Sequence, residues 1–174
     1  MPRDFDILAT TSRGFERAAC FELKYLLEQA GDPSADVRKS GVRGLIVAKT
    51  VLDPFQAVRI LRGILVERPY EFRYTLRIIP IEATVTTDLT AIADKAEELS
   101  SKIGENETFR VTVEKRFTTL HANEIVEAVA ANIKRKVDLA RPDKIILIQV
   151  VGGSTGVSTI RPEDVISVMK EKML

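Results

Sequence analysis

The segment from Lys115 to Glu124 holds the residues of this chain whose types are best suited to chemistry or ligand binding. It reads KRFTTLHANE and contains two adjacent cations, two threonines and the only histidine of the protein. Histidine titrates near neutral pH and serves as a general base, a metal ligand or a hydrogen-bond donor. The position of His121 relative to its neighbours therefore decides whether the sequence indicates an enzyme.

The spacing around His121 predicts the start of a helix. Glu124 follows three residues later and the helical apolar period begins at Ile125, which is the spacing of a capping box. Histidine is a poor N-cap, so Thr119 is a competing cap. A helix N-terminus disfavours the imidazolium but leaves a flat ring with an N–H donor, on which a phosphate or a base can rest. Three interpretations stay open: a structural cap, a nucleic-acid contact and a catalytic group.

The rest of the sequence shows no group that would act together with His121 in catalysis. No distinctive nucleophile lies near it in sequence, and one cysteine, Cys20, with one histidine excludes a Cys/His zinc site within the chain. The glycines of VVGGSTGV lack the spacing of a phosphate or dinucleotide loop and fit a tight hairpin at Gly152 and Gly153. The carboxylate pairs all have structural explanations as helix surface, loop or helix first turn. We therefore expect no catalytic residue, no metal and no cofactor.

The cations beside His121 carry a stronger signal. Lys115 and Arg116 end the predicted strand 108–116, next to the helix N-terminus, where basic side chains and exposed N–H groups make an anion site. The helix that follows has Ile125, Val129, Ile133 and Val137 at helical spacing. It is expected to end with the cations of the KRK run at residues 134–136.

Two groups of elements must position these residues. Residues 1–80 are predicted as strand, helix, strand, strand, helix, strand, which is the order of a ferredoxin-like domain. Residues 81–174 are predicted as helix, strand, helix, strand, strand, helix, with the last helix opening at Pro162. The fold class is therefore α/β (α+β), with two domains, 1–80 and 81–174.

Composition sets the remaining limits. The 174 residues are 45% hydrophobic and 29% charged, as in a folded soluble protein, and the net charge is +1. No apolar run approaches the roughly 20 residues that span a bilayer, and the N-terminus lacks a signal-peptide pattern. We expect a cytoplasmic protein without membrane contact, which can bind nucleic acid only by placing cations locally.

The second half resembles a THUMP domain. The similarity rests on FRVTVEKR, the helix after it, KVDLARPDKIILIQV and TGVSTI, and the predicted helix from Asp88 extends it to residues 81–174. This module occurs in tRNA thiouridine synthetases, RNA methylases, pseudouridine synthases and tRNA acetylation factors, usually after a ferredoxin-like domain. HANEIVEAV and TGVSTIRPEDVISV are most similar to the stand-alone branch related to the fungal adaptor for tRNA cytidine acetylation.

The resemblance implies RNA binding, chiefly of a tRNA acceptor end with its single-stranded CCA. Lys115, Arg116 and His121 are the RNA-binding residues that it implies. Loops of the first domain add further cations that could face the same groove, namely Arg13, Arg38, Lys39 and Arg43. No catalytic domain is expected after the THUMP domain.

The implied function is that of an RNA-binding adaptor and not of an enzyme. Its partners would be tRNA and an RNA cytidine acetyltransferase, with no DNA. Two alternatives stay open: an RNA-modifying enzyme that acts alone, and a ferredoxin-like assembly module that binds no RNA.

Overall fold

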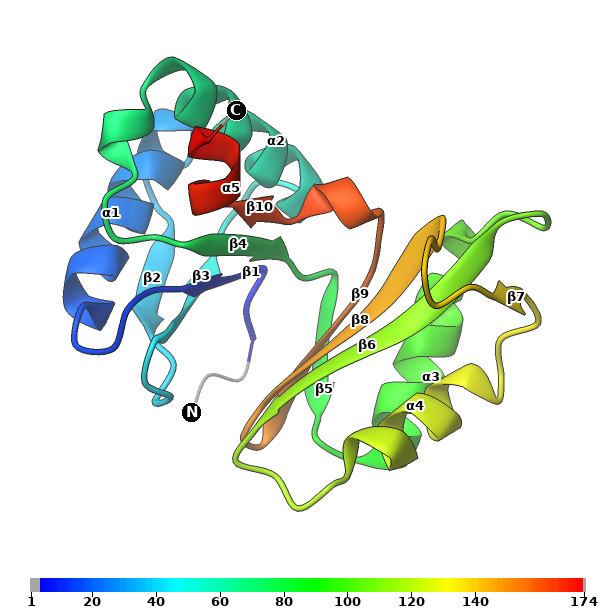
Figure 1. Cartoon of the computed structure of the whole chain (residues 1–174). Helices are drawn as coiled ribbons and strands as arrows, with labels where there is room; N and C mark the ends of the chain where they lie inside the picture. Colours follow the sequence, from blue (N-terminus) through cyan, green and yellow to red (C-terminus); the bar gives the residue numbers. More distant parts are fainter. Residues whose placement is uncertain (1–3, 174) are drawn as a thin grey trace. The chain divides into compact units, whose positions relative to one another are not determined.

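The computed structural model describes residues 4–173, which divide into two compact units (Figure 1). One unit comprises residues Asp4–Ile81 together with the C-terminal segment from Glu163, and the other comprises Glu82–Pro162. The first contains the following elements: β1 (Ile7–Thr10), α1 (Glu16–Gln29), β2 (Asp36–Lys39), β3 (Leu45–Lys49), α2 (Pro54–Glu67), η1 (Pro69–Glu71), β4 (Arg77–Pro80), β10 (Ile166–Ser167) and α5 (Val168–Lys172).

The first unit is ferredoxin-like, as its element order predicts. Its sheet has the order β10-β4-β1-β3-β2, and all neighbouring strands run antiparallel. Ile7 of the central strand β1 lies opposite Ala48 on one side and Pro80 on the other. Helices α1 and α2 cover one face of this sheet, where apolar side chains of both layers form the core (Figure 1).

Local signals explain where the helices of this unit begin and end. Asp53 caps α2 by accepting a hydrogen bond from the Gln56 N–H at 3.0 Å, and Pro54 occupies the first turn, which is the helix start that an Asp-Pro pair in the sequence predicts. At the end of α1, Gly31 has φ +114°, a left-handed conformation that closes the helix. Phe15 lies at helical spacing with Ala19 and Leu23, which predicts a place in the apolar stripe of α1. It is instead half exposed at the N-cap of the helix and stacks on Tyr74.

The C-terminal segment corrects the predicted domain assignment. Residues 81–174 were expected to form one domain ending in a helix from Pro162, but only a 3₁₀ turn, η3 (Pro162–Asp164), lies there. The chain then forms β10, which pairs with β4 of the first unit with Ile166 opposite Ile78. Glu171 of α5 accepts a hydrogen bond from Arg62 Nε at 2.6 Å. These long-range contacts assign the segment to the first unit, a result that local sequence signals could not supply.

The second unit has a mixed sheet with helices on one face (Figure 1). Its elements are β5 (Ala83–Thr86), α3 (Leu89–Leu99), η2 (Ser100–Lys102), β6 (Thr108–Arg116), α4 (Ala122–Ala130), β7 (Lys136–Val137), β8 (Lys144–Val151) and β9 (Ser154–Ile160). The strand order is β5-β9-β8-β6-β7, with β6 parallel to β7 and β8 and the other pairs antiparallel. Phe109, Ile125 and Ile146 belong to the core between this sheet and its helices.

Helix α4 is shorter than its apolar period predicts. It ends at Ala130, so the KRK run does not end the helix as expected. Ile133 still packs into the core, but Val137 lies in β7 opposite Phe109. Arg135 donates hydrogen bonds to the carbonyls of Ile103 and Gly104. Ile133 and Val137 continue the helical spacing of apolar residues, but they are not helical. Strand pairing and these tertiary hydrogen bonds determine the structure of the segment instead.

Candidate nucleic-acid interface

Lys115 and Arg116 lie side by side in sequence at the end of β6 but on opposite faces of its sheet. Side chains alternate along a strand. Val111 and Val113 face the core under the helices, so Lys115 projects on the helix side and is exposed. Arg116 projects on the other face together with Glu114. The structure thus separates the two cations that the sequence joins.

Arg116 is held by hydrogen bonds within the sheet. It donates from one guanidinium nitrogen to Gln149 Oε1 at 2.7 Å and from the other to Glu114 Oε2 at 3.4 Å. Gln149 Nε2 donates to Glu114 Oε1 at 3.2 Å, which closes the cluster. Because its side chain is only 18% exposed, Arg116 has a structural role that Lys115 lacks.

The loop between β6 and α4 displays an aromatic ring. Phe117 has φ 55°, the left-handed conformation that a bulky residue rarely adopts, and its side chain is 70% exposed. Such a conformation costs on the order of 1–3 kcal/mol and persists where the surrounding structure imposes it. Here the Gly152 N–H donates to the Arg116 carbonyl at 2.9 Å and fixes the chain just before the ring.

A second set of hydrogen bonds fixes the turn that faces this loop. Gly152 and Gly153 connect β8 and β9 as a tight hairpin, as predicted, and Gly152 has φ 62°. Thr87 binds both carbonyls: its N–H donates to Gly153 at 3.0 Å and its hydroxyl donates to Gly152 at 2.8 Å. The turn is therefore anchored on one side to β6 and on the other to the start of α3.

The loop and the turn line an open hollow of about 470 Å³. Phe117 supplies an apolar wall, and the other walls are polar or bare backbone from Thr87, Thr118, Thr119 and the two glycines. An exposed ring, hydroxyl groups and peptide edges suit an unstacked base, which binds by stacking and by hydrogen bonds to its edges. The hollow itself was not predicted from sequence, although a phenylalanine between cations and threonines is a signal that could have pointed to it.

His121 is the N-cap of α4, which favours the structural interpretation over a catalytic one. Its backbone is extended, with ψ 144°, and its N–H is bonded to Glu124 Oε1 at 3.1 Å. The residue is exposed beside the loop of Phe117. Within residues 4–173, no group of three or more His, Cys, Asp or Glu side chains could hold a metal ion. The geometry leaves His121 available for contact with a ligand at the helix N-terminus.

The cations predicted in the first unit lie near one end of its sheet. Arg13 follows β1 and Arg43 lies in the β2–β3 turn, and both are exposed. The Thr11 N–H bonds the Gly44 carbonyl at 3.0 Å, which holds these two connections together. Lys39 ends β2, whereas Arg38 forms an ion pair with Asp36. That these four residues share a groove with Lys115 stays a prediction.

Other basic residues of the second unit have structural partners. Lys144 is buried and donates to Glu107 Oε1 at 2.6 Å, and this bond is the main cause that holds the pKa of Glu107 below its usual value. Arg135 binds carbonyls, as described above. Lys134 and Lys136 are exposed. Only part of the basic sequence pattern is therefore free to bind an anion.

The second unit contains the part of the chain that matches a known protein family. Residues 86–160 match the model of the THUMP domain, and the match begins before α3 and ends with β9. Residues 86–160 form a THUMP domain. The THUMP domain is an RNA-binding module, so Lys115 and the loop with Phe117 lie within a domain of that type.

The chain also resembles longer proteins. An uncharacterized protein of Methanocaldococcus jannaschii is 25% identical over 167 residues, which cover 93% of this chain and 42% of the relative. The chain therefore spans less than half the length of that relative. Among solved structures, PH1313 from Pyrococcus horikoshii has a TM-score of 0.68 at 21% identity, and the match covers 90% of this chain and 54% of the other.

Two further solved structures share the fold at lower similarity. TrmN from Thermus thermophilus has a TM-score of 0.56 at 16% identity and covers 90% of this chain and 46% of its own. A 4-thiouridine synthetase–RNA complex with bound ATP has a TM-score of 0.53 at 16% identity and covers 94% of this chain and 42% of its own. At these sequence identities the likenesses show similarity of fold alone. Along residues 4–173, no helix is both long and apolar enough to cross a bilayer.

Proposed function

We propose that this protein binds tRNA at its acceptor end and presents it to a separate modifying enzyme. The observation that carries the proposal is that the exposed Phe117 lines an open hollow with polar walls within a THUMP domain. The ring stacks on a base of the single-stranded CCA end. Lys115 and the N-terminus of α4, with His121, bind the adjacent phosphates.

The likeness to known structures supports the choice of tRNA. One of the similar solved structures is a 4-thiouridine synthetase bound to RNA, and its fold matches 94% of this chain. The modification that we propose is cytidine N4-acetylation, with an RNA cytidine acetyltransferase as the partner. In a reconstituted reaction, acetylcytidine should form only when tRNA, the acetyltransferase and this protein are all present. Equal acetylation without this protein would contradict the adaptor role.

Removal of the CCA end should weaken tRNA binding by about tenfold, since a stacked base contributes roughly 1–3 kcal/mol. The measurement is fluorescence anisotropy of one labelled tRNA with and without its CCA, and enzymatic restoration of the CCA is the control. Affinity for the intact tRNA should also fall linearly on a logarithmic salt scale as counterions are released. Equal affinity of the trimmed and intact tRNA would exclude the acceptor end as the docking site.

The two cations at the end of β6 should respond differently to alanine substitution. Lys115→Ala should lower tRNA affinity severalfold and reduce the salt slope by about 1, with thermal stability unchanged. Arg116→Ala should lower the free energy of unfolding by roughly 1–3 kcal/mol, because it removes the hydrogen bonds that Gln149 Oε1 and Glu114 Oε2 accept from the guanidinium group. Thermal unfolding and anisotropy on both variants separate the effects, and a stable Arg116→Ala with wild-type affinity would refute the assigned role.

A second candidate function is an RNA-modifying enzyme that acts without a partner. The observation that favours it is that several of the similar solved structures are named as enzymes or putative enzymes, among them the 4-thiouridine synthetase and a putative methyltransferase. The test is to incubate the purified protein with tRNA and either acetyl-CoA or S-adenosylmethionine and to analyse the nucleosides by mass spectrometry. The result distinguishes an adaptor from an enzyme that acts alone. A new modified nucleoside made by this protein alone would replace the adaptor proposal.

A further inference from the structure

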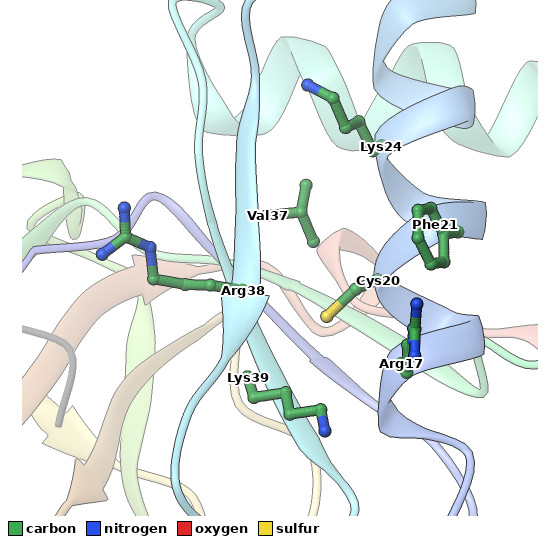
Figure 2. A pocket seen from close by; sticks show the side chains of 7 residues that line it. All are labelled: Arg17, Cys20, Phe21, Lys24, Val37, Arg38 and Lys39. Carbon is green, nitrogen blue, oxygen red and sulfur yellow. The ribbon is translucent and has the colours of Figure 1, made fainter.

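A groove of about 270 Å³ lies between helix α1 and strand β2 of the ferredoxin-like unit (Figure 2). The side chains of Cys20 and Val37 lie between the helix and the strand and are half-buried. Burial raises the pKa of the Cys20 thiol, consistent with an apolar site. Phe21 stands at the rim and is 64% exposed. The groove thus has an apolar floor and an exposed aromatic ring at its edge.

The remaining lining residues are all basic: Arg17 and Lys24 from α1, and Arg38 and Lys39 from β2. Two of these cations have partners within the unit, since Lys24 Nζ donates to the Ala35 carbonyl at 2.6 Å and Arg38 pairs with Asp36. The Arg17 guanidinium lies 5.7 Å from the centre of the Phe21 ring. None of the lining residues is acidic, so the groove presents a positive charge that complements an acidic occupant.

Strand β2 is the edge strand of its sheet and turns polar backbone groups away from β3. The Ser40 N–H bonds the Leu45 carbonyl at 3.3 Å, which fixes Ser40 and Leu45 as a bonded pair. Bonded and non-bonded pairs alternate in an antiparallel ladder, so Val37 and Lys39 are in the non-bonded positions relative to Ala48 and Ile46. Their N–H and C=O groups point outward, where an added strand would pair with them.

We propose that this groove binds an extended acidic segment of a partner protein as an additional strand beside β2. The backbone of the segment pairs with the outward groups of Val37 and Lys39. Its aliphatic side chains enter the floor beside Cys20, and its carboxylates meet Arg17 and Lys39. Strand addition of this kind takes affinity from main-chain hydrogen bonds and specificity from alternate side chains.

The backbone geometry favours a peptide over the other occupants. A single-stranded RNA could bind the cations through its phosphates and stack a base on the Phe21 ring, but it would not form strand-pairing hydrogen bonds with the outward backbone groups of β2. A second copy of this chain would bring the same four cations against the first set, so like charges would repel. An acidic strand supplies hydrogen-bond partners for the edge of β2, aliphatic side chains for the apolar floor and carboxylates for the cations.

The test uses a fluorescein-labelled peptide of about eight residues that alternates Glu and Val, a length typical of a strand. Its binding to the full chain is measured by anisotropy. One matched control carries N-methyl groups on alternate amides in the register that faces β2, which removes the pairing donors. The other replaces every Glu with Lys. We expect saturable binding of the acidic peptide, with at least about tenfold weaker binding of both controls.

Variants locate the site on the protein. Phe21→Ala and Arg17→Glu change exposed positions of α1 and should each lower peptide affinity by about fivefold or more without altering thermal stability. Arg59→Glu, an exposed charge reversal on α2, is the matched control and should bind as wild type does. These three variants should keep wild-type tRNA affinity, so failure here is distinct from failure of the tRNA proposal.

Four results would overturn the inference. They are no saturable binding of the acidic peptide, equal binding of its N-methylated form, displacement of the bound peptide by a single-stranded RNA oligonucleotide, and a dimer in sedimentation that Arg17→Glu or Phe21→Ala dissociates. The third result would identify the groove as an RNA site that uses Arg38 and Lys39. The fourth would identify it as an interface between two copies.

Discussion

Phe117→Ala should weaken tRNA binding by about tenfold while the protein stays folded. Stacking of one base on an aromatic ring is worth roughly 1–3 kcal/mol, and the side chain of Phe117 is 70% exposed, so little packing is lost with it. Anisotropy with intact tRNA measures the affinity, and thermal unfolding measures the stability. If the ring stacks on a base of the CCA end, the variant should bind intact and CCA-trimmed tRNA almost equally.

Two control variants make this result specific. Leu139→Ala removes another exposed apolar side chain of the THUMP domain, 67% exposed, and should bind tRNA as wild type does. Phe117→Trp keeps a stacking surface and should retain affinity. If Phe117→Ala and wild type bound intact tRNA equally, the hollow beside the Gly152–Gly153 turn would not be the site of the CCA end.

Asp32→Ala should lower the free energy of unfolding by about 3 kcal/mol, because it leaves buried donors without an acceptor. Asp32 is 1% exposed and follows the left-handed Gly31 at the end of α1. Its carboxylate accepts hydrogen bonds from the Thr50 hydroxyl at 2.6 Å, the Val51 N–H at 2.9 Å and the Ser34 N–H at 3.0 Å. The carboxylate therefore joins the α1–β2 connection to the end of β3.

The pH dependence of stability gives an independent check on Asp32. Burial acts to raise the pKa of this carboxyl, but the hydrogen bonds from Thr50, Val51 and Ser34 outweigh it and lower the pKa from 3.8 to about 2. The stabilisation is therefore complete above pH 3.8 and is lost as the pH falls toward 2. Denaturant unfolding between about pH 5 and pH 2 should show a steeper loss of stability for wild type than for Asp32→Ala.

A surface carboxylate of the same unit serves as the control for Asp32. Asp36→Ala removes an exposed partner of Arg38 and should change stability by less than about 0.5 kcal/mol at any pH. Equal stability of Asp32→Ala and Asp36→Ala would show that the buried hydrogen bonds contribute nothing measurable.

Local sequence signals predicted the ferredoxin-like order and the ends of several helices. Such signals can be read in the sequence at Asp53-Pro54 before α2, at Gly31 after α1 and at Asp88, which caps α3 by accepting from the Ala91 N–H at 3.0 Å. Such caps act over one helical turn, so neighbouring residues suffice to reveal them. The spacing of His121 and Glu124 likewise indicated the start of α4, where His121 is the N-cap.

The predictions for the end of α4 and for the C-terminal segment were wrong because long-range contacts decide both. Helix α4 ends at Ala130 because Val137 pairs with Phe109 and Arg135 binds the carbonyls of residues 103 and 104. The last segment joins the first unit because β10 pairs with β4. Both results depend on partners at least about 28 residues away in sequence, at distances where no local propensity acts.

The sequence by itself determined the kind of protein: two α+β units, a THUMP pattern and cations that end a strand beside a helix start. Only the tertiary structure decided what those residues do. It bound Arg116 to Gln149 and Glu114, left Lys115 exposed on the other face, and fixed Phe117 outward beside the Gly152–Gly153 turn. The reason is that a side chain is engaged or free according to the strands that lie next to it, and strand pairing joins residues far apart in the chain.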